Sequence, residues 1–286
     1  MLKQYYWLTK PGIIYGNLMY LLAGFFFASV MTQGFDGWLL ASTAIGTSLV
    51  IASGCVFNNY TDRGVDKKMA RTKKRALAKG SIPAAYALAY GAALGAVGFV
   101  VLAAFTNWLV VCIGIVGIVD YVFLYAYCKR TSVHGTLVGS ISGAMPPVAG
   151  YCAVTGEFDL GALLLFLLLV AWQMPHFYAI AMYRRNDYAA AGIPVLPVVK
   201  GVRRTKIEIA AYVIVFTATA LLMTAFGYTG IVYLLIMAAV GLVWLYKAFT
   251  GFVAADDVQW ARGMFGFSLV ITLAVSLLLP LGAWLP

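Results

Sequence analysis

Residues 38–80 read WLLASTAIGTSLVIASGCVFNNYTDRGVDKKMARTKKRALAKG, an apolar run that passes directly into a polar and strongly basic segment. The apolar part, 38–57, has roughly the 20 residues that a helix needs to cross the hydrocarbon core of a bilayer. Basic residues gather on the cytoplasmic side of membrane helices. This stretch therefore predicts a membrane-spanning helix whose basic end faces the cytoplasm.

The rest of the chain has the same apolar character. Of its 286 residues, 63% are hydrophobic and only 10% are charged, and the mean hydropathy is +0.90. Soluble domains carry about 45–50% apolar and about 25% charged residues. The composition thus excludes an ordinary soluble enzyme, a disordered chain and a coiled coil, and it predicts an all-α membrane protein that forms one domain over residues 1–286.

Further apolar runs of similar length follow along the chain, and we count nine membrane spans in all. Seven or eight spans are the alternative count, because two of the runs nearly touch at Thr106 and Asn107. The nine spans are 12–31, 38–57, 84–105, 108–127, 133–154, 160–182, 207–226, 229–249 and 264–284.

The charged residues predict the orientation. With nine spans, all 20 Lys and Arg residues fall on one side of the membrane, and the opposite loops carry only Asp36, Glu157 and Asp159. By the positive-inside rule the N-terminus is cytoplasmic and the C-terminus lies outside. The first residues lack the layout of a signal or transit peptide, which favours a bacterial inner membrane. Because the net charge of +10 lies between apolar spans, we expect no nucleic-acid partner.

Asn58, Asp62 and Asp66 follow one another at intervals of four residues. On a helix this spacing places them on one face, about 6 Å apart per step. Carboxylates of this kind suit Mg²⁺ together with substrate phosphates, and the basic run downstream could hold the remaining phosphate charge. The alternative is that both acids simply pair with Arg63, Lys67 and Lys68 while the basic run contacts anionic lipid.

The segment NNYTDRGVD (58–66) resembles the NxxxDxxxD signature of the UbiA superfamily of intramembrane prenyltransferases. The segment after it, 71–80, is similar to the family's continuation, although Ala76 stands where proline is usual. Other segments resemble, within that superfamily, the protohaem farnesyltransferases. These are TKPGIIYGNL (9–18), YAYCKRTS (125–132), GSISGAMPPVAGY (139–151) and WQMPHFYAIAMYRRNDYAAAGIPVLPVVKG (172–201).

The resemblance implies a bundle around a central cavity that opens to the cytoplasm. It also implies transfer of the farnesyl group of farnesyl diphosphate to a vinyl group of haem b, giving haem O for haem-copper oxidases. Contact with oxidase assembly proteins or with haem A synthase would follow from that role. The implied metal is Mg²⁺, held by Asn58, Asp62 and Asp66. The residues implied to bind the diphosphate are Arg71, Lys74, Arg75, Tyr125, Lys129 and Arg130.

The second half of the chain departs from the members that act on quinones, whose second motif is a DxxxD. Here the matching stretch offers only Asp187 with Arg184 and Arg185, a set that suits an anionic co-substrate such as haem with its two propionates. His176 follows Pro175 within an apolar run. The resemblance implies that His176 contacts the haem iron or forms a polar wall, and the alternative is a packed core histidine.

Three other functions fit parts of the sequence. A related prenyltransferase would act on a quinone precursor or a chlorin, a transporter would move haem or lipid, and an assembly factor would have no catalytic activity. Asp120 is an intramembrane acid that the resemblance does not cover. Gly143, Pro146 and Pro147 are expected to interrupt the fifth span, and the four cysteines are expected to be packing residues.

Overall fold

The computed structural model describes residues 2–285, and within this range nine helical spans are long and apolar enough to cross a membrane, which confirms the predicted count. The spans are α2 (Pro11–Thr32), α3 (Gly37–Asp66), α5 (Ala84–Phe105), α6 (Trp108–Val119) continued by the π-helical turn η1 (Asp120–Leu124) and α7 (Tyr125–Thr131), α8 (Gly135–Thr155), α9 (Leu160–Tyr183), α12 (Gly201–Ala225), α13 (Ile231–Thr250) continued by the 3-10 turn η2 (Gly251–Val253), and α14 (Asp257–Trp284). The short helices are α1 (Leu2–Leu8), α4 (Ala76–Lys79), α10 (Arg185–Ala190) and α11 (Leu196–Val199).

Four of the spans, α3, α6, α9 and α14, begin at a polar residue whose side chain accepts hydrogen bonds from otherwise unpaired backbone N–H groups. Asp36 accepts from the backbone of Trp38 and Leu39 at the start of α3, and Asp159 accepts from that of Ala162 at the start of α9. Two of the three acids expected on the outer side therefore cap helices.

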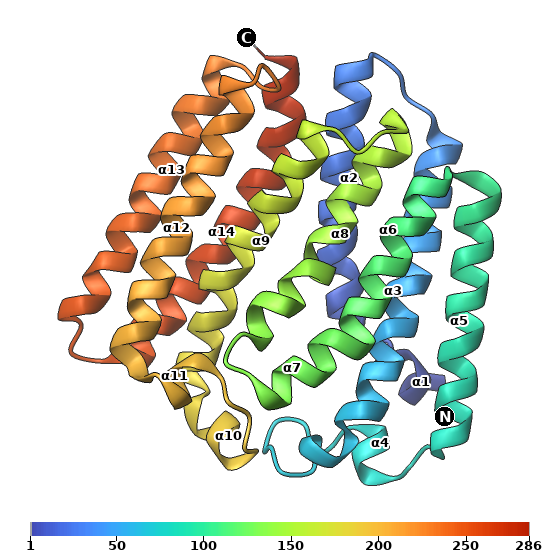
Figure 1. Ribbon diagram of the computed structural model, residues 1–286, viewed down its shortest axis with the longest axis vertical. Coiled ribbons are helices and arrows are strands. Elements are labelled where there is room, and N and C mark those ends of the chain that lie inside the picture. The colour runs from blue at the N-terminus through green and yellow to red at the C-terminus, as the bar shows by residue number, and fades with distance from the viewer. Residues whose placement is uncertain (1, 286) are drawn as a thin grey trace.

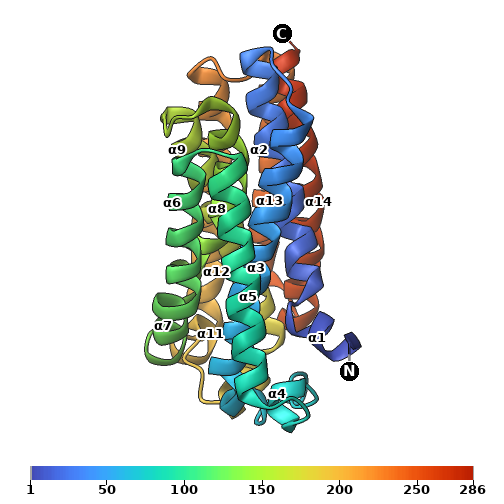
Figure 2. The same cartoon turned by 90° about the vertical axis from the view of Figure 1, so that its right-hand side faces the viewer.

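The spans run side by side along the long axis of the molecule (Figures 1 and 2). Helix α9 is the most buried of them and packs against α8, α12 and α14. Helix α14 also contacts α2, while α2 packs on α8, and α3 packs on α5. The N-terminus and the short helices α1, α4, α10 and α11 lie at one end of the bundle, and the C-terminus lies at the other (Figure 1).

Several helices extend beyond the apolar runs that predicted them. Helix α3 continues to Asp66 rather than ending at residue 57, and α14 begins at Asp257 rather than at residue 264. Hydropathy marks only the part of a helix that lies in hydrocarbon. The polar end of α3 stays helical because other segments of the protein bury its side chains.

The expected interruption at Pro146 and Pro147 is wrong, since α8 is helical throughout. Helix α2 packs closely along this part of α8. A Cβ atom at Gly24 would lie 2.1 Å from the Pro147 carbonyl oxygen, and one at Gly150 would lie 2.2 Å from that of Leu21. Neighbouring helices thus hold α8 in shape where proline removes hydrogen bonds.

Candidate functional site

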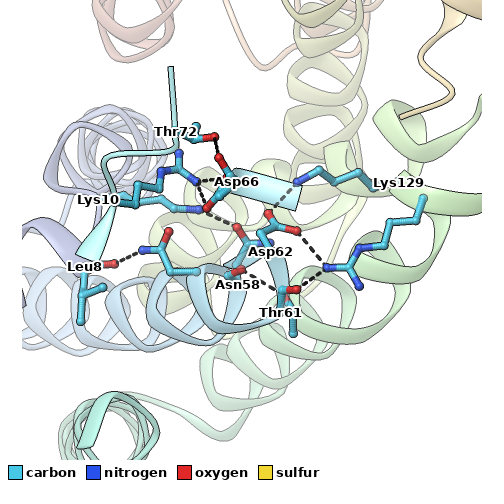
Figure 3. Close-up of polar contacts among 11 residues, drawn as sticks. Leu8, Lys10, Asn58, Thr61, Asp62, Asp66, Thr72 and Lys129 are labelled. Carbon is cyan, nitrogen blue, oxygen red and sulfur yellow. Dashed lines mark hydrogen bonds and ion pairs between the residues drawn. The ribbon is translucent and has the colours of Figure 1, made fainter. Parts of the chain in front are cut away.

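The polar half of the predicted site lies at the C-terminal end of α3. Asn58, Asp62 and Asp66 follow one face of the helix, with only 2%, 2% and 4% of their surfaces exposed. Figure 3 shows them pointing toward Lys10 and Lys129, which come from other parts of the chain. The expectation that the three side chains share a helix face is confirmed.

Asp62 is paired with two cations from α7. Lys129 Nζ lies 2.6 Å from Asp62 Oδ2, and Arg130 Nη2 lies 3.2 Å from Asp62 Oδ1. Arg130 also donates to the carbonyl oxygen of Thr61 at 2.6 Å. Two side chains predicted from the YAYCKRTS segment therefore meet the acid predicted from the NNYTDRGVD segment.

Asp66 is held by the loop that follows α3. Arg75 Nη1 donates to both carboxylate oxygens of Asp66, at 3.1 and 2.9 Å. The alternative pairing with Arg63, Lys67 and Lys68 is wrong, because those three side chains are exposed and form no ion pair with either acid within residues 2–285.

Asn58 completes the row and contacts Lys10, which lies between α1 and α2. Lys10 Nζ donates to Asn58 Oδ1 at 2.5 Å, whereas the buried Asn58 Nδ2 has no partner in the described part of the chain. Burial, together with the positive charges of Arg75 and Lys129, lowers the pKa of Lys10 to about 8. The ammonium group still carries its charge at neutral pH.

The backbone of Lys10 is unusual. Its φ angle of 52° lies in the left-handed region, which is rare for residues other than glycine, and it precedes Pro11. Strain of this kind persists where the surroundings enforce it, often at functional sites. Here the strained turn brings the side chain of Lys10 to Asn58.

A cavity of about 750 Å³ opens beside this row of residues. Its polar end is lined by Lys10, Asn58, Asp62, Asp66, Arg71, Arg75, Lys129 and Arg184. Its apolar part is lined by Val50, Ile51, Leu102, Val110, Ile113, Ile118, Met145 and Ala149. A charged end and a long apolar interior match a ligand with an anionic head and a hydrocarbon tail.

The predicted residues divide into those that line the cavity and those that do not. The predicted residues that line the cavity are Asn58, Asp62, Asp66, Arg71, Arg75, Tyr125, Lys129, His176 and Arg184. Lys74, Arg130, Arg185 and Asp187 are not among its lining residues, although Arg130 contacts Asp62. Asp187 pairs instead with Arg184 at 3.5 Å.

Some lining residues were not predicted as site residues. The sequence predicts Lys10 only as one of the charges on the basic side, and it predicts no role for Tyr121, Gln173 or Tyr188. Lys10 sits in the TKPG segment, so a lysine before a helix-starting proline was the available signal. The other three are polar residues in apolar or loop sequence and carry no spacing signal.

The turn η1 orients the aromatic residues of this wall. Asp120 is buried there, and its Oδ2 accepts from the backbone N–H of Ser142 at 3.0 Å. Tyr121 and Tyr125 then stack at 5.7 Å, and Lys129 Nζ lies 5.6 Å from the centre of the Tyr125 ring. Turns of π-helix inside α-helices often occur at functional sites.

A metal ion would have to be bound largely by oxygen atoms here. In residues 2–285 no three His, Cys, Asp or Glu side chains gather as a metal-binding group. Asp62, Asp66 and Asn58 offer two carboxylates and one amide oxygen, a set that fits Mg²⁺, which usually takes one or two carboxylates and completes its shell with water and phosphate. The unpartnered amide nitrogen of Asn58 shows that this row is not a closed structural network.

Two groups of known proteins resemble this chain in sequence. The UbiA prenyltransferase family matches residues 17–278. Proteins named protoheme IX farnesyltransferase from Citrobacter koseri and Escherichia coli are each 50% identical over 287 aligned residues, covering 100% of this chain and 96% of theirs.

Solved structures resemble it in fold. A digeranylgeranylglyceryl phosphate synthase has a TM-score of 0.81 at 20% identity, covering 99% of this chain and 98% of its own. A UbiA homologue from Archaeoglobus fulgidus, bound to GPP and Mg²⁺, has a TM-score of 0.70 at 14% identity, covering 95% of this chain and 98% of its own. The extent of the family match, together with relatives that are half identical over the whole chain, establishes that this protein belongs to the UbiA prenyltransferase family.

Proposed function

We propose that this protein transfers the farnesyl group of farnesyl diphosphate to a vinyl group of haem b, giving haem O. The observation that carries the proposal is the 50% identity, over the full chain, to proteins named protoheme IX farnesyltransferase. The cavity supports it independently, because its charged end and apolar interior suit a prenyl diphosphate. Haem O would then serve the biogenesis of haem-copper oxidases.

The cations at the polar end bind the diphosphate. Lys129, Arg75 and Lys10 already surround the acid row, and Arg71 lines the same part of the cavity. Positive charge fixed in advance around the phosphates stabilises the negative charge that develops as the C1–O bond breaks. Arg130 supports this arrangement through Asp62.

The Mg²⁺ ion is assigned to Asp62 and Asp66, with Asn58 as a lesser ligand. A divalent cation bound there supplies additional charge stabilisation to the departing diphosphate. The solved homologue that binds GPP and Mg²⁺ supports a divalent metal for this fold. The chain's own contribution is to hold two buried carboxylates one helical turn apart and to keep cations beside them.

The reaction begins when the C1–O bond of farnesyl diphosphate breaks. Loss of diphosphate leaves an allylic cation at C1 of the farnesyl group, and the vinyl group of haem forms a C–C bond to it. The second cation, on the former vinyl carbon, is captured by water, which releases a proton and leaves a hydroxyethylfarnesyl side chain. Farnesyl diphosphate, haem b and water thus give haem O, diphosphate and a proton.

The haem-binding side is assigned to the α9 end of the cavity. Arg184 lines the cavity there and is assigned to a propionate, with Arg185 and Asp187 as neighbours outside the lining. Lys74 is exposed and is assigned to the approach of anionic substrates rather than to a contact inside the cavity.

The proposed location is the bacterial inner membrane, with the N-terminus in the cytoplasm and the polar end of the cavity facing it. The cytoplasm supplies the farnesyl diphosphate. Basic loops are typical of the cytoplasmic side of a membrane protein. Contact with oxidase assembly proteins or haem A synthase would pass the product on.

The test measures product in membranes that contain the wild-type protein, Asp62→Ala, Asp66→Ala or Glu157→Ala. We expect a haem heavier by one farnesyl group and one hydroxyl group with wild type and Glu157→Ala, and none with either site variant, because the two acids hold the metal. Removing divalent metal with EDTA should abolish product, and Mg²⁺ should restore it.

Absence of haem O with the wild-type protein would overturn the proposed function, and haem O at wild-type levels in both Asp variants would overturn the assignment of the metal to these acids. Offering a quinone precursor or a chlorin as acceptor to the same membranes separates this function from a related prenyltransferase. A transporter would show no product with any acceptor, and its activity would not need Mg²⁺.

A further inference from the structure

Gln173 on α9 is fixed by two hydrogen bonds that use only its amide nitrogen. Nε2 donates to the Ser140 carbonyl oxygen on α8 at 3.0 Å and to the Leu169 carbonyl oxygen on its own helix at 3.1 Å. Carbonyl oxygens only accept hydrogen bonds, so these two partners decide which end of the amide is the nitrogen. Both amide hydrogens are used, and the buried side chain is held in one orientation.

The Oε1 atom of Gln173 is left as an acceptor that faces the cavity. It accepts no hydrogen bond within residues 2–285, yet it is not sealed inside the protein as the Asn58 amide nitrogen is. Gln173 lines the cavity, and so does Gly143 on α8. A Cβ atom at Gly143 would lie 2.0 Å from Gln173 Oε1, so only glycine leaves room for this oxygen.

Contacts between neighbouring helices give the depth of this oxygen in the bundle. Asp120 in η1 accepts from the α8 backbone at the residue before Gly143, and the tyrosine ring that follows it would lie 3.2 Å from a Cβ atom at Gly54 of α3. Gly54 precedes Asn58 by four residues, which is about 6 Å along the helix. Gln173 Oε1 therefore lies about one helical turn inward from the acid row, between the polar and the apolar part of the cavity.

A packing role explains the amide nitrogen of Gln173 but not its oxygen. The hydrogen bond from Nε2 to Ser140 joins α9 to α8 and would be enough for packing. A buried acceptor without a partner costs free energy, so an acceptor of this kind is usually satisfied by water or by a ligand. The arrangement of Gln173 and Gly143 is therefore that of a water site on the cavity wall.

The proposed reaction needs one water molecule inside the cavity. When the terminal carbon of the vinyl group bonds to C1 of the farnesyl group, the cation is left on the carbon attached to the porphyrin, two bonds from C1. That cation can lose a proton from the neighbouring CH₂ group, which gives an alkene, or it can bond to water, which gives the hydroxyl group. A water molecule held in place favours the second outcome, because capture must be faster than proton loss.

We propose that Gln173 Oε1 binds the water molecule that captures the second cation, and that Gly143 leaves the room for it; this proposal rests on the proposed function. The amide oxygen accepts a hydrogen bond from the water, which turns a lone pair of the water oxygen toward the cation. A C–O bond forms, and the proton that the oxygen then loses passes to the released diphosphate. Gln173 thus decides between alcohol and alkene and takes no part in farnesyl transfer itself.

The test compares wild type with Gln173→Met and Gly143→Ala, each purified, checked for a monodisperse elution profile in detergent, and incubated with farnesyl diphosphate, haem b and Mg²⁺. Methionine keeps the length of glutamine but removes the acceptor, whereas the Gly143 substitution crowds Oε1 and leaves Gln173 in place. The controls are Gln259→Met, whose side chain is exposed, and Gly263→Ala, where a Cβ atom has no neighbour within 4 Å. Mass spectrometry separates haem O from the alkene, which is lighter by one water.

We expect wild type and both controls to give haem O with little alkene. In Gln173→Met and Gly143→Ala the ratio of alkene to haem O should rise by about tenfold, the effect of losing one hydrogen bond to the water. The total amount of farnesylated haem should stay close to that of wild type, because the residues that bind the diphosphate are unchanged. A residue with only a structural role would lower the total and leave the ratio as it is.

The ratio measured for Gln173→Met decides the question if that variant folds, and the ratio for Gly143→Ala decides it if that variant alone folds. A wild-type ratio in the deciding variant would overturn the proposal, and so would the loss of all farnesylated haem, since Gln173 would then serve the transfer step. In either case farnesylated haem from the wild type leaves the proposed function standing. If the wild type itself gives no farnesylated haem, the proposed function fails, and this proposal fails with it.

Discussion

At the scale of single residues, the row Asn58, Asp62 and Asp66 is notable because each member faces a cation from a different segment of the chain. Exposed ion pairs contribute about 0–1 kcal/mol, whereas breaking a buried pair costs about 3–5 kcal/mol. The side chains of Asp62 and Lys129 are 3% and 19% exposed, and that of Arg130 is 40% exposed. Lys129 is therefore the more important partner of Asp62.

The first residue-scale prediction concerns Lys129→Ala, with Lys68→Ala as the control. We expect Lys129→Ala to lower kcat for farnesyl transfer by about 10²–10³-fold, because it removes a fixed positive charge beside the departing diphosphate. Lys68 is exposed and unpaired with Asp62 or Asp66, so its variant should retain wild-type activity. Initial rates of haem O formation at saturating substrate measure both. Equal losses would mean that only the overall charge of the loops matters.

At the scale of elements, the contact between α2 and α8 keeps the wall of the cavity in place. Gly24 and Gly150 allow the two backbones to approach until no side chain fits between them. Small residues at helix interfaces serve this purpose in membranes, where close packing replaces the hydrophobic effect as the driving force. The same region of α8 contributes Pro146 and Ala149 to the cavity lining.

The element-scale prediction follows from that contact. Gly24→Ala should destabilise the protein by about 1–3 kcal/mol, the usual cost of overpacking, because its new methyl group would meet the Pro147 carbonyl. Gly266→Ala in α14 is the control, since a Cβ atom there has no neighbour within 4 Å. Thermal unfolding in detergent compares the variants. A midpoint for Gly24→Ala equal to that of the control would refute the close approach.

At the scale of the whole molecule, the nine spans found within residues 2–285 place the loops that carry Lys and Arg at one end of the bundle. The acid row and the polar end of the cavity lie at that same end, at the termini of α3, α7 and α9. The charge that is predicted to orient the chain and the charge that surrounds the site are thus partly the same residues. Arg75 and Lys129 belong to both groups.

The orientation can be tested with single cysteines placed in a background that lacks the four native ones. Gly34→Cys lies in the exposed loop between α2 and α3, and Lys73→Cys lies in the exposed loop after α3. A membrane-impermeant maleimide added to intact cells should label the first and not the second. Labelling of Lys73→Cys alone would reverse the proposed orientation.

The sequence by itself determined the number of spans, their approximate positions and the helix face shared by Asn58, Asp62 and Asp66. These properties depend on local composition and on the helical repeat, both of which can be read along one segment. The resemblance carried by the segments 58–66 and 172–201 also predicted the family. Local sequence did not predict that α8 remains helical at Pro146, because the contact with α2 decides this.

Only the tertiary structure decided which cations serve the acid row. Arg63 and Lys67 are adjacent to the acids in sequence but are exposed and form no ion pair with them within residues 2–285. Lys10 and Lys129 instead reach the acid row from distant segments, and Arg75 reaches it from the loop after α3. The hydrogen-bond partner of His176 is likewise Ser268, which lies 92 residues further along the chain. A residue's ionic and hydrogen-bond partners are set by the packing of whole helices, and spacing within one helix carries no record of that packing.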